Sequence, residues 1–162
     1  YETIREAGRA LDLKLVGLHA MDSLRIEKAF RHFGHDITCE DNVVDAGLGF
    51  AVKTAKNDFI GREAVLKRKE EGPKLRMLQF KLTDPEPLLF HHEPIVRGGE
   101  VVGYLSSGNY GHTLGAAIGL GYVPAEFAKE TDGWEIEVAG MRIAAEASLR
   151  PMYDPKSERV KV

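Results

Sequence analysis

The stretch PIVRGGEVVGYL, residues 94–105, has the pattern of two short β-strands joined by a tight turn at Gly98-Gly99. Apolar and β-branched residues flank the glycine pair, and glycine accepts the positive φ angles that a two-residue hairpin turn requires. The stretch WEIEVAGMRIAAEASL, residues 134–149, repeats the pattern about Ala139-Gly140. The two stretches predict a pair of β-hairpins, and so an antiparallel sheet in the second half of the chain.

Two more runs belong to the same predicted sheet. Residues 75–82 have strand-like composition, but the apolar phase slips between Met77 and Leu78, which indicates either a β-bulge or burial on both faces. Residues 117–123 form a further apolar run. Five or six short strands with tight turns are typical of a small antiparallel barrel or sandwich.

The first part of the chain has helical patterns instead. Thr3 and Glu6 have the spacing of a capping box, which predicts a helix that ends near Asp12. A short β-favouring run follows at residues 13–18, and a charge-rich helix is predicted over residues 60–71. The fold class predicted from these patterns is α+β, with one domain over residues 1–72 and a small antiparallel β-barrel-like domain with a tail over residues 73–162.

A further helix is predicted to begin after Asp22 or Ser23, either of which can cap it, and to end at Gly34. Four apolar residues should share its buried face: Ile26, Ala29, Phe30 and Phe33. Glu27 lies about 100° round from Ile26, at the flank of that face. Its carboxylate either forms an i, i+4 ion pair with Arg31 or grips a ligand at the edge of a cavity. From the residues alone, we favour the ion pair.

The composition excludes some classes of partner. The chain has 162 residues, 43% of them hydrophobic, and a net charge of −3, so it has no basic footprint for nucleic acid. No apolar run approaches the roughly 18 residues that a membrane span needs. Cys39 is the only cysteine, which favours a reducing compartment, the cytoplasm or the mitochondrial matrix in a eukaryote. Because the chain starts at Tyr1, we expect it to be a piece of a longer protein.

Signatures of common catalytic sites are missing from the sequence, including dinucleotide-binding, Walker, nucleophile-elbow and zinc-protease motifs. His32 and His35 are three residues apart and His91 and His92 are adjacent, but no third ligand of matching spacing accompanies either pair. We therefore predict hydrogen-bonded or surface histidines and no metal site.

The segment SSGNYGHTLG, residues 106–115, is rich in glycine and serine and lies between two predicted strands. Its glycines would allow a ligand to approach the backbone closely, and Tyr110 offers a flat surface for stacking. The same composition also makes a plain connecting loop, which is the interpretation that composition favours.

Four motifs in this order resemble the C-terminal half of the aminomethyltransferase family, typified by the glycine cleavage system T-protein. Within the family, the sequence is most similar to the folate-binding regions of dimethylglycine and sarcosine dehydrogenases. Three segments show this similarity: the aromatic segment after Glu27, the sequence around Tyr110 and the PMYDP tail. The motifs are GLHAMDSLRIEKAFRHFGHDI (17–37), DAGLGFAVKTAKNDFIGREAVL (45–66), GGEVVGYLSSGNYGHTLGAAIGLGYVPAEF (98–127) and LRPMYDPKSERVKV (149–162).

The resemblance implies a tetrahydrofolate-binding cavity. The matching glutamate in the family grips the pterin, which assigns that role to Glu27. Tyr110 is the candidate for stacking on the bound cofactor. A basic residue before the DFIG motif is expected to meet the glutamyl tail of folate, and this maps to Lys56 or Lys53. Residues 1–72 would then be the trailing part of the folate-binding α+β domain, packed against the N-terminal part of the protein.

The resemblance also implies what this segment lacks. The aspartate that serves chemistry in the family lies upstream, so no catalytic residue is assigned here. By resemblance, the whole protein would move a one-carbon unit from an N-methyl or aminomethyl donor to tetrahydrofolate, with FAD in an upstream domain if it is a dehydrogenase. The alternative is a structural module that has lost folate binding. The iron–sulfur maintenance branch is disfavoured, because residues 59–63 read FIGRE without its cysteine.

Overall fold

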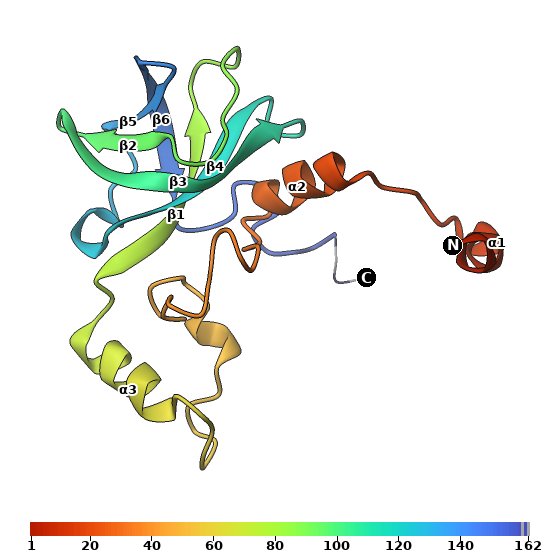
Figure 1. Ribbon diagram of the computed structural model, residues 1–162, viewed down its shortest axis with the longest axis horizontal. Coiled ribbons are helices and arrows are strands. Elements are labelled where there is room, and N and C mark those ends of the chain that lie inside the picture. The colour runs from red at the N-terminus through yellow and green to blue at the C-terminus, as the bar shows by residue number, and fades with distance from the viewer. Residues whose placement is uncertain (160, 162) are drawn as a thin grey trace.

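Six antiparallel strands close into a barrel in the second half of the chain (Figure 1). The computed structural model describes residues 1–159 and 161. Around the barrel the strands follow the order β1-β4-β3-β2-β5-β6. Their bounds are β1 Leu75–Leu82, β2 Pro94–Arg97, β3 Glu100–Gly111, β4 Ala116–Pro124, β5 Trp134–Val138 and β6 Met141–Ser148. The prediction of an α+β fold with a small antiparallel barrel is confirmed, and both predicted hairpins form, as β2–β3 and β5–β6.

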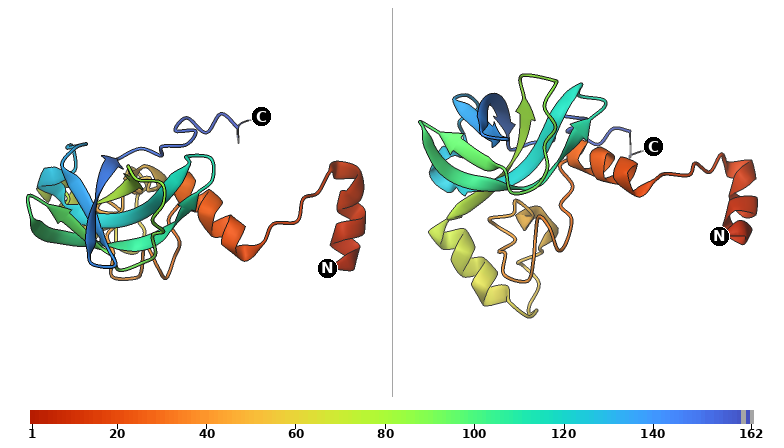
Figure 2. Two further views of the ribbon diagram at one scale, coloured as in Figure 1. Left: turned by 90° about the horizontal axis from the view of Figure 1, so that it is seen from above. Right: turned by 45° about the horizontal axis from the view of Figure 1, so that its top comes forward.

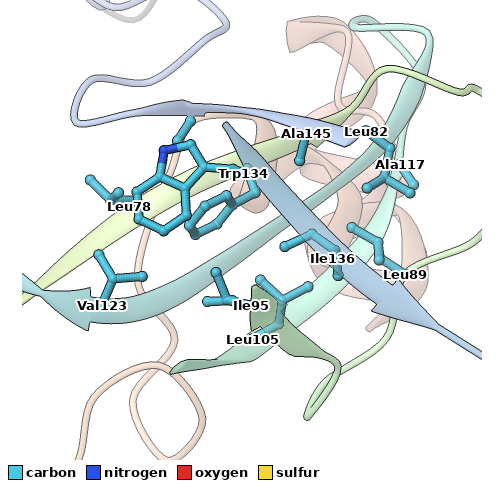
Figure 3. Packing of buried hydrophobic residues seen from close by; sticks show 12 residues of the cluster. Leu78, Leu82, Leu89, Ile95, Leu105, Ala117, Val123, Trp134, Ile136 and Ala145 are labelled. Atoms are coloured by element: carbon cyan, nitrogen blue, oxygen red, sulfur yellow. The ribbon is translucent and has the colours of Figure 1, made fainter. Parts of the chain in front are cut away.

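The barrel interior is filled by apolar side chains from every strand (Figure 3). Trp134 is its largest side chain, and its ring lies edge-on to that of Phe80 with 5.5 Å between the centroids. The indole nitrogen donates a hydrogen bond to the Glu130 carbonyl, so the buried polar group is satisfied. Alternating side chains point inward along each strand, and this periodicity is what the sequence pattern had predicted.

Strand β1 is buried on both faces, which explains its slipped apolar pattern. Leu78 and Phe80 point into the barrel, whereas Met77 belongs to a second cluster on the outer wall. The register of β1 against β4 is unbroken, so of the two predicted explanations the bulge is wrong and the double burial is confirmed. The second cluster forms where helix α2 packs on the barrel, and its members are Ile26, Ala29, Met77, Ile118 and Leu120.

The helices lie outside the barrel (Figures 1 and 2). Helix α2 packs on β3 and β4, α1 projects away at the end of an extended linker, and α3 leads into β1. Among the described residues, none of these helices has the length and apolarity that a membrane crossing needs. The bounds are α1 Glu2–Gly8, η1 Arg9–Leu11, α2 Leu18–Glu27, η2 Gly49–Ala51, α3 Arg62–Glu71 and η3 Ala125–Phe127.

Two predictions for the N-terminal helices are wrong in detail. Thr3 does not cap α1, because the helix begins two residues earlier than predicted, with Tyr1 at the N-cap position and no side-chain cap bond. The run at residues 13–17 is extended but pairs with no described strand. A strand requires a neighbouring edge for its backbone hydrogen bonds, and local β-propensity cannot supply one.

Helix α2 also differs from its prediction at both ends. It starts at Leu18, ahead of the expected caps, and it ends at Glu27 instead of Gly34. Ala29 has a φ of 51°, which takes the backbone out of the helical path. As a result Phe30 and Phe33 are exposed, and the predicted single apolar face of four residues does not form.

Candidate functional site

Glu27 is buried at the last turn of α2, with only 1% of its surface exposed. The backbone N–H of Thr113 donates a hydrogen bond to Oε1 over 2.6 Å. The other oxygen, Oε2, is buried and has no hydrogen-bond partner among the described residues. A buried carboxylate oxygen without a donor is costly, so this atom marks a place where a donor from outside the described chain would be favourable.

Arg31 does not pair with Glu27, so the ion pair that the sequence favoured is wrong. Because the helix stops before Ala29, Arg31 no longer lies one turn beyond Glu27, and its guanidinium donates to the carbonyls of Ala29 and Ala46 instead. Burial lowers the pKa of Arg31 from its ordinary value, against the opposing effects of the Tyr122 hydroxyl and Asp36. Arg31 therefore holds the loop that follows α2.

Tyr110 lies beside the same helix. Its carbonyl oxygen accepts a hydrogen bond from the Ser23 hydroxyl over 2.6 Å, one helical turn before Glu27. The Tyr110 ring lies edge-on to that of His112, with 5.2 Å between the centroids. Strand β3 and the turn after it thus supply both Tyr110 and the N–H of Thr113 that holds Glu27.

A cavity of about 310 Å³ opens on this side of α2. It is lined by His19, Ala20, Ser23, Leu24, Asn109 and His112. Ser23 and Glu27 are four residues apart on one face of the helix, and His112 directly precedes Thr113. The cavity therefore adjoins the position of Glu27 without being lined by it.

The segment 106–115 is not a connecting loop, contrary to the sequence interpretation. Residues 106–111 belong to β3, and only the turn to β4 is irregular. Ser106 is an extra residue in the β3–β4 register, which passes from Leu105 directly to Ser107 opposite consecutive residues of β4. Such a bulge changes the direction of side chains, and here Ser106 contacts Asp36 in the loop after α2 while Ser107 contacts Arg25 in α2 itself.

A buried polar network that the sequence analysis missed fixes this loop. The Asp36 carboxylate accepts hydrogen bonds from the Ser106 hydroxyl, the Arg25 guanidinium and the backbone N–H of His32. Arg25 also donates to the Ser107 hydroxyl over 2.8 Å. Ser106 lies 70 positions from Asp36 in the sequence and Arg25 lies 11 positions from it, so helix and strand periodicity could not bring these side chains together.

Lys53 and Lys56 are exposed and lie apart from Glu27. Both belong to the segment that precedes α3, at the end of the molecule distant from α2 (Figures 1 and 2). A second cavity of about 510 Å³ lies next to Lys56, lined by residues 57–59 and 61–64. The structure thus brings Glu27 and Tyr110 together and does not bring either lysine to them.

The two histidines of each pair lie in ring-to-ring contact. The rings of His32 and His35 are 4.5 Å apart and nearly parallel, and those of His91 and His92 meet edge-on at 4.6 Å. Over residues 1–159 and 161, no group of three or more His, Cys, Asp or Glu side chains is arranged to hold a metal ion.

Two family models match the chain. The model described as the glycine cleavage T-protein C-terminal barrel domain matches residues 75–154, which include the whole barrel. The model described as the GCVT N-terminal domain matches residues 1–56. The predicted domain boundary between residues 72 and 73 is not tested by these matches and stays a prediction.

Similar proteins are enzymes of much greater length. The 4-methylaminobutanoate oxidase (formaldehyde-forming) of Paenarthrobacter nicotinovorans is 42% identical over 99% of the chain, which covers 19% of that protein. An aminomethyltransferase of Exiguobacterium sibiricum is 37% identical over 88% of the chain and 39% of its own length. Human mitochondrial sarcosine dehydrogenase is 34% identical over 99% of the chain and 18% of its own length. The chain thus spans between about a fifth and two fifths of these relatives.

A solved structure shares the fold. The glycine cleavage system aminomethyltransferase T from Bartonella henselae superposes with a TM-score of 0.81 at 28% identity. The match covers 93% of the chain described here and 45% of the Bartonella protein.

Proposed function

The chain belongs to the glycine cleavage T-protein, or aminomethyltransferase, family, and from this premise we propose that it is the tetrahydrofolate-binding C-terminal portion of an enzyme of one-carbon transfer. The enzyme moves a one-carbon unit from an N-methyl or aminomethyl donor to tetrahydrofolate. Relatives named as sarcosine and dimethylglycine dehydrogenases support a demethylating enzyme, with FAD bound in another domain. In such a protein the compartment is the cytoplasm or, in a eukaryote, the mitochondrial matrix.

The buried carboxylate of Glu27 carries the proposal. It sits in a helix end that is packed on the barrel, one oxygen is held by the Thr113 N–H, and Oε2 is buried without a donor in the part of the chain that the structure describes. A side chain selected only for stability would be apolar at this position or would pair with a cation. The arrangement is what a ligand-gripping carboxylate requires.

The chemistry of the pterin ring fits this carboxylate. The ring presents its exocyclic amino group and the adjacent N–H as two parallel donors, and a carboxylate accepts both in a charge-assisted pair. Each carboxylate oxygen has two lone pairs, so Oε1 can serve Thr113 and still accept from the ligand. Glu27 thereby orients the ring, and Tyr110 beside it supplies a flat surface against which the ring can stack.

The other end of folate is acidic and needs a cation. Lys56 or Lys53 is the proposed partner of the glutamyl tail. The p-aminobenzoyl group separates the pterin from that tail, so the two ends of one folate have no need to meet neighbouring residues. The exposure of both lysines leaves either ammonium free to form the point-charge contact that a lysine provides.

The described residues bind and orient; none is assigned to catalysis. The nitrogens of bound tetrahydrofolate supply the nucleophile for the one-carbon unit. The chain holds the ring at a defined angle and shields it from water along α2 and β3, and the catalytic aspartate expected in the family belongs to a part of the protein upstream of residue 1.

The surface formed by α1, the linker and α2 has the properties of an interface with a large partner. This surface exposes a series of large apolar side chains, namely Ile4, Leu11, Leu13, Leu15, Val16, Leu18, Met21 and Leu24. Exposed apolar residues in such number mark an interface. We assign it to the N-terminal part of the same protein, which would also close the folate cavity.

The test is tetrahydrofolate binding by the intact polypeptide, measured by titration calorimetry under reducing conditions. Glu27→Gln should weaken binding roughly 10- to 100-fold, because a hydrogen bond to a charged acceptor contributes about 1.5–3 kcal/mol. Glu2→Gln, on the exposed helix α1, is the matched control and should bind like the wild type. A wild type without measurable affinity would reject the proposal and favour a structural module that has lost folate binding. Unchanged affinity for Glu27→Gln would reject Glu27 as the residue that grips the pterin.

A further inference from the structure

The chain after the barrel crosses back to the end of α2. We call residues 151–158 the C-terminal strap. The strap begins after β6 and reaches the residues on either side of the α2 terminus, more than a hundred positions earlier in the sequence. Its hydrogen bonds there involve the backbone of Glu27 and the side chain of Lys28.

Gln79 links the barrel, the helix and the strap. Its side-chain amide is buried and donates to the carbonyl oxygens of Ile26 and Glu27 over 2.7 and 3.2 Å. The side-chain oxygen of Gln79, Oε1, accepts a hydrogen bond from the backbone N–H of Met152 over 2.7 Å. The backbone N–H of Tyr153 then donates to the Glu27 carbonyl over 3.4 Å. Glu27 is therefore tied through its main chain to β1 and to the strap at once.

Lys28 and Asp154 form the second attachment. Lys28 Nζ lies 3.0 Å from Asp154 Oδ2 and also donates to the Asp154 carbonyl over 2.6 Å. Both side chains are about nine-tenths buried. Burial alone would raise the pKa of Asp154, but hydrogen bonds from Lys28 and from the N–H groups of Glu158 and Arg159 outweigh it and hold that pKa below its usual value.

These contacts act where the helix is weakest. The last carbonyls of a helix have no intrahelical donor, and the end of a helix frays unless other groups supply one. Glu27 is the last helical residue of α2, so its carboxylate depends on the groups that satisfy this terminus. The cation of Lys28 also lies at the negative end of the helix dipole.

We propose that Lys28, Gln79 and Asp154 are positioning residues that hold the Glu27 carboxylate at the angle that pterin recognition requires. The inference rests on the proposed function of Glu27. The strap is thus a part of the folate site, although none of its residues needs to touch the ligand. It explains why the polar tail beyond the barrel has a nearly buried aspartate that meets a nearly buried lysine at the end of α2.

The experiment measures tetrahydrofolate binding by the intact polypeptide for Asp154→Asn and Lys28→Met. Each variant keeps the approximate shape of the side chain and removes its charge. Binding should weaken roughly 10-fold, as expected when a recognition group is displaced by a fraction of an ångström to an ångström. Lys28→Arg keeps a cation opposite Asp154 and should recover most of the affinity. Thermal unfolding of each variant establishes that it is folded.

A double variant separates positioning from general destabilisation. If the strap acts through Glu27, Glu27→Gln combined with Asp154→Asn should bind about as well as Glu27→Gln alone. Arg97→Met is the matched control: Arg97 is a mostly buried cation that stacks on Trp134 at 4.6 Å, on the β2–β3 hairpin away from α2. Its loss should lower stability and leave folate affinity within about 2-fold.

The outcomes distinguish the two proposals. A wild type that does not bind tetrahydrofolate refutes the proposed function. Binding that depends on Glu27 but is unchanged in Asp154→Asn and Lys28→Met overturns the positioning role alone. Strictly additive losses in the double variant, or an equal loss of affinity in Arg97→Met, would likewise overturn it, because the effect would then be one of stability.

Discussion

The barrel and the N-terminal region differ in the burial of their apolar residues. The barrel buries a core of large side chains, all of which come from residues 75–148 (Figure 3). Helices α1 and α3 have no buried residue in the described structure, and the linker before α2 exposes a run of aliphatic side chains. Helix α2 is intermediate, because one face packs on the barrel and the opposite face is open.

The difference teaches where each region obtains its stability. The barrel closes its own hydrogen bonds and buries its own core, so it has no need of further chain. The N-terminal region has few apolar contacts of its own and depends on what covers it. Glu27 lies at the border between the two, where a rigid wall can support a ligand that a second region then encloses.

The largest expected effect is the difference in stability loss between a substitution in the barrel interior and one on helix α1. Phe80→Ala, in the barrel interior, should lower the free energy of unfolding by about 3–5 kcal/mol. Ile4→Ala, on exposed α1, should change it by less than about 0.5 kcal/mol. Urea titration of the chain of residues 1–162, followed by fluorescence of its single tryptophan in the barrel core, measures both. Similar losses for the two variants would show that α1 is packed as tightly as the barrel.

A stability change of intermediate size is expected at Glu27, on the border between the barrel and the N-terminal region. Glu27→Gln keeps an acceptor for the Thr113 N–H and removes a buried charge whose Oε2 has no described partner. It should therefore raise stability by about 1 kcal/mol in the absence of folate, equivalent to about 2–4 °C in the melting temperature. Differential scanning calorimetry provides the measurement. A clear loss of stability would mean that Glu27 is held by more than the contact to Thr113.

The smallest expected effect is the pH dependence of the stability that Asp154 in the strap contributes. Because the folded-state pKa of Asp154 lies below its usual value of 3.8, its stabilisation is complete above that pH and is lost as pH falls through the lower folded-state pKa. Lys28 is the charged side chain that contacts it. The stability difference between wild type and Asp154→Asn should be constant near neutral pH and should shrink below about pH 3.8. A difference that grows on acidification would contradict the ion pair.

Sequence patterns predicted the barrel well and the site only in part. Strand alternation located both hairpins, because side-chain direction in a strand follows from sequence position. For β1 it left a bulge and burial on both faces as alternatives, and the structure decided for the second. The pairing of Glu27 with Arg31 was wrong, since it assumed a helix that continues to Gly34, whereas Ala29 leaves the helical path. The helical pattern did not indicate that change, because the loop is held in part by the hydrogen bond between Asp36 and Ser106, 70 positions apart in the sequence.

The segment around Tyr110 illustrates the same limit. Its glycines and serines suggested a loop, yet β4 on one side and α2 on the other keep residues 106–111 in a strand. Close packing favours small residues there, since a side chain on Gly108 would collide with the backbone of Phe90. Composition cannot distinguish a small residue that bends the chain from one that allows two segments to touch.

The sequence by itself determined the two strand pairings that are hairpins, β2–β3 and β5–β6, the family, and the presence of one acidic residue beside an apolar helix face. Only the tertiary structure decided the pairings that close the barrel. It also decided that the acidic residue is buried, which donor holds it, and that the C-terminal strap and Gln79 tie its backbone in place. The physical reason is the distance along the sequence over which each property is set. Strand and helix periodicity depends on neighbouring residues, whereas burial and hydrogen-bond partners depend on groups that the fold brings together.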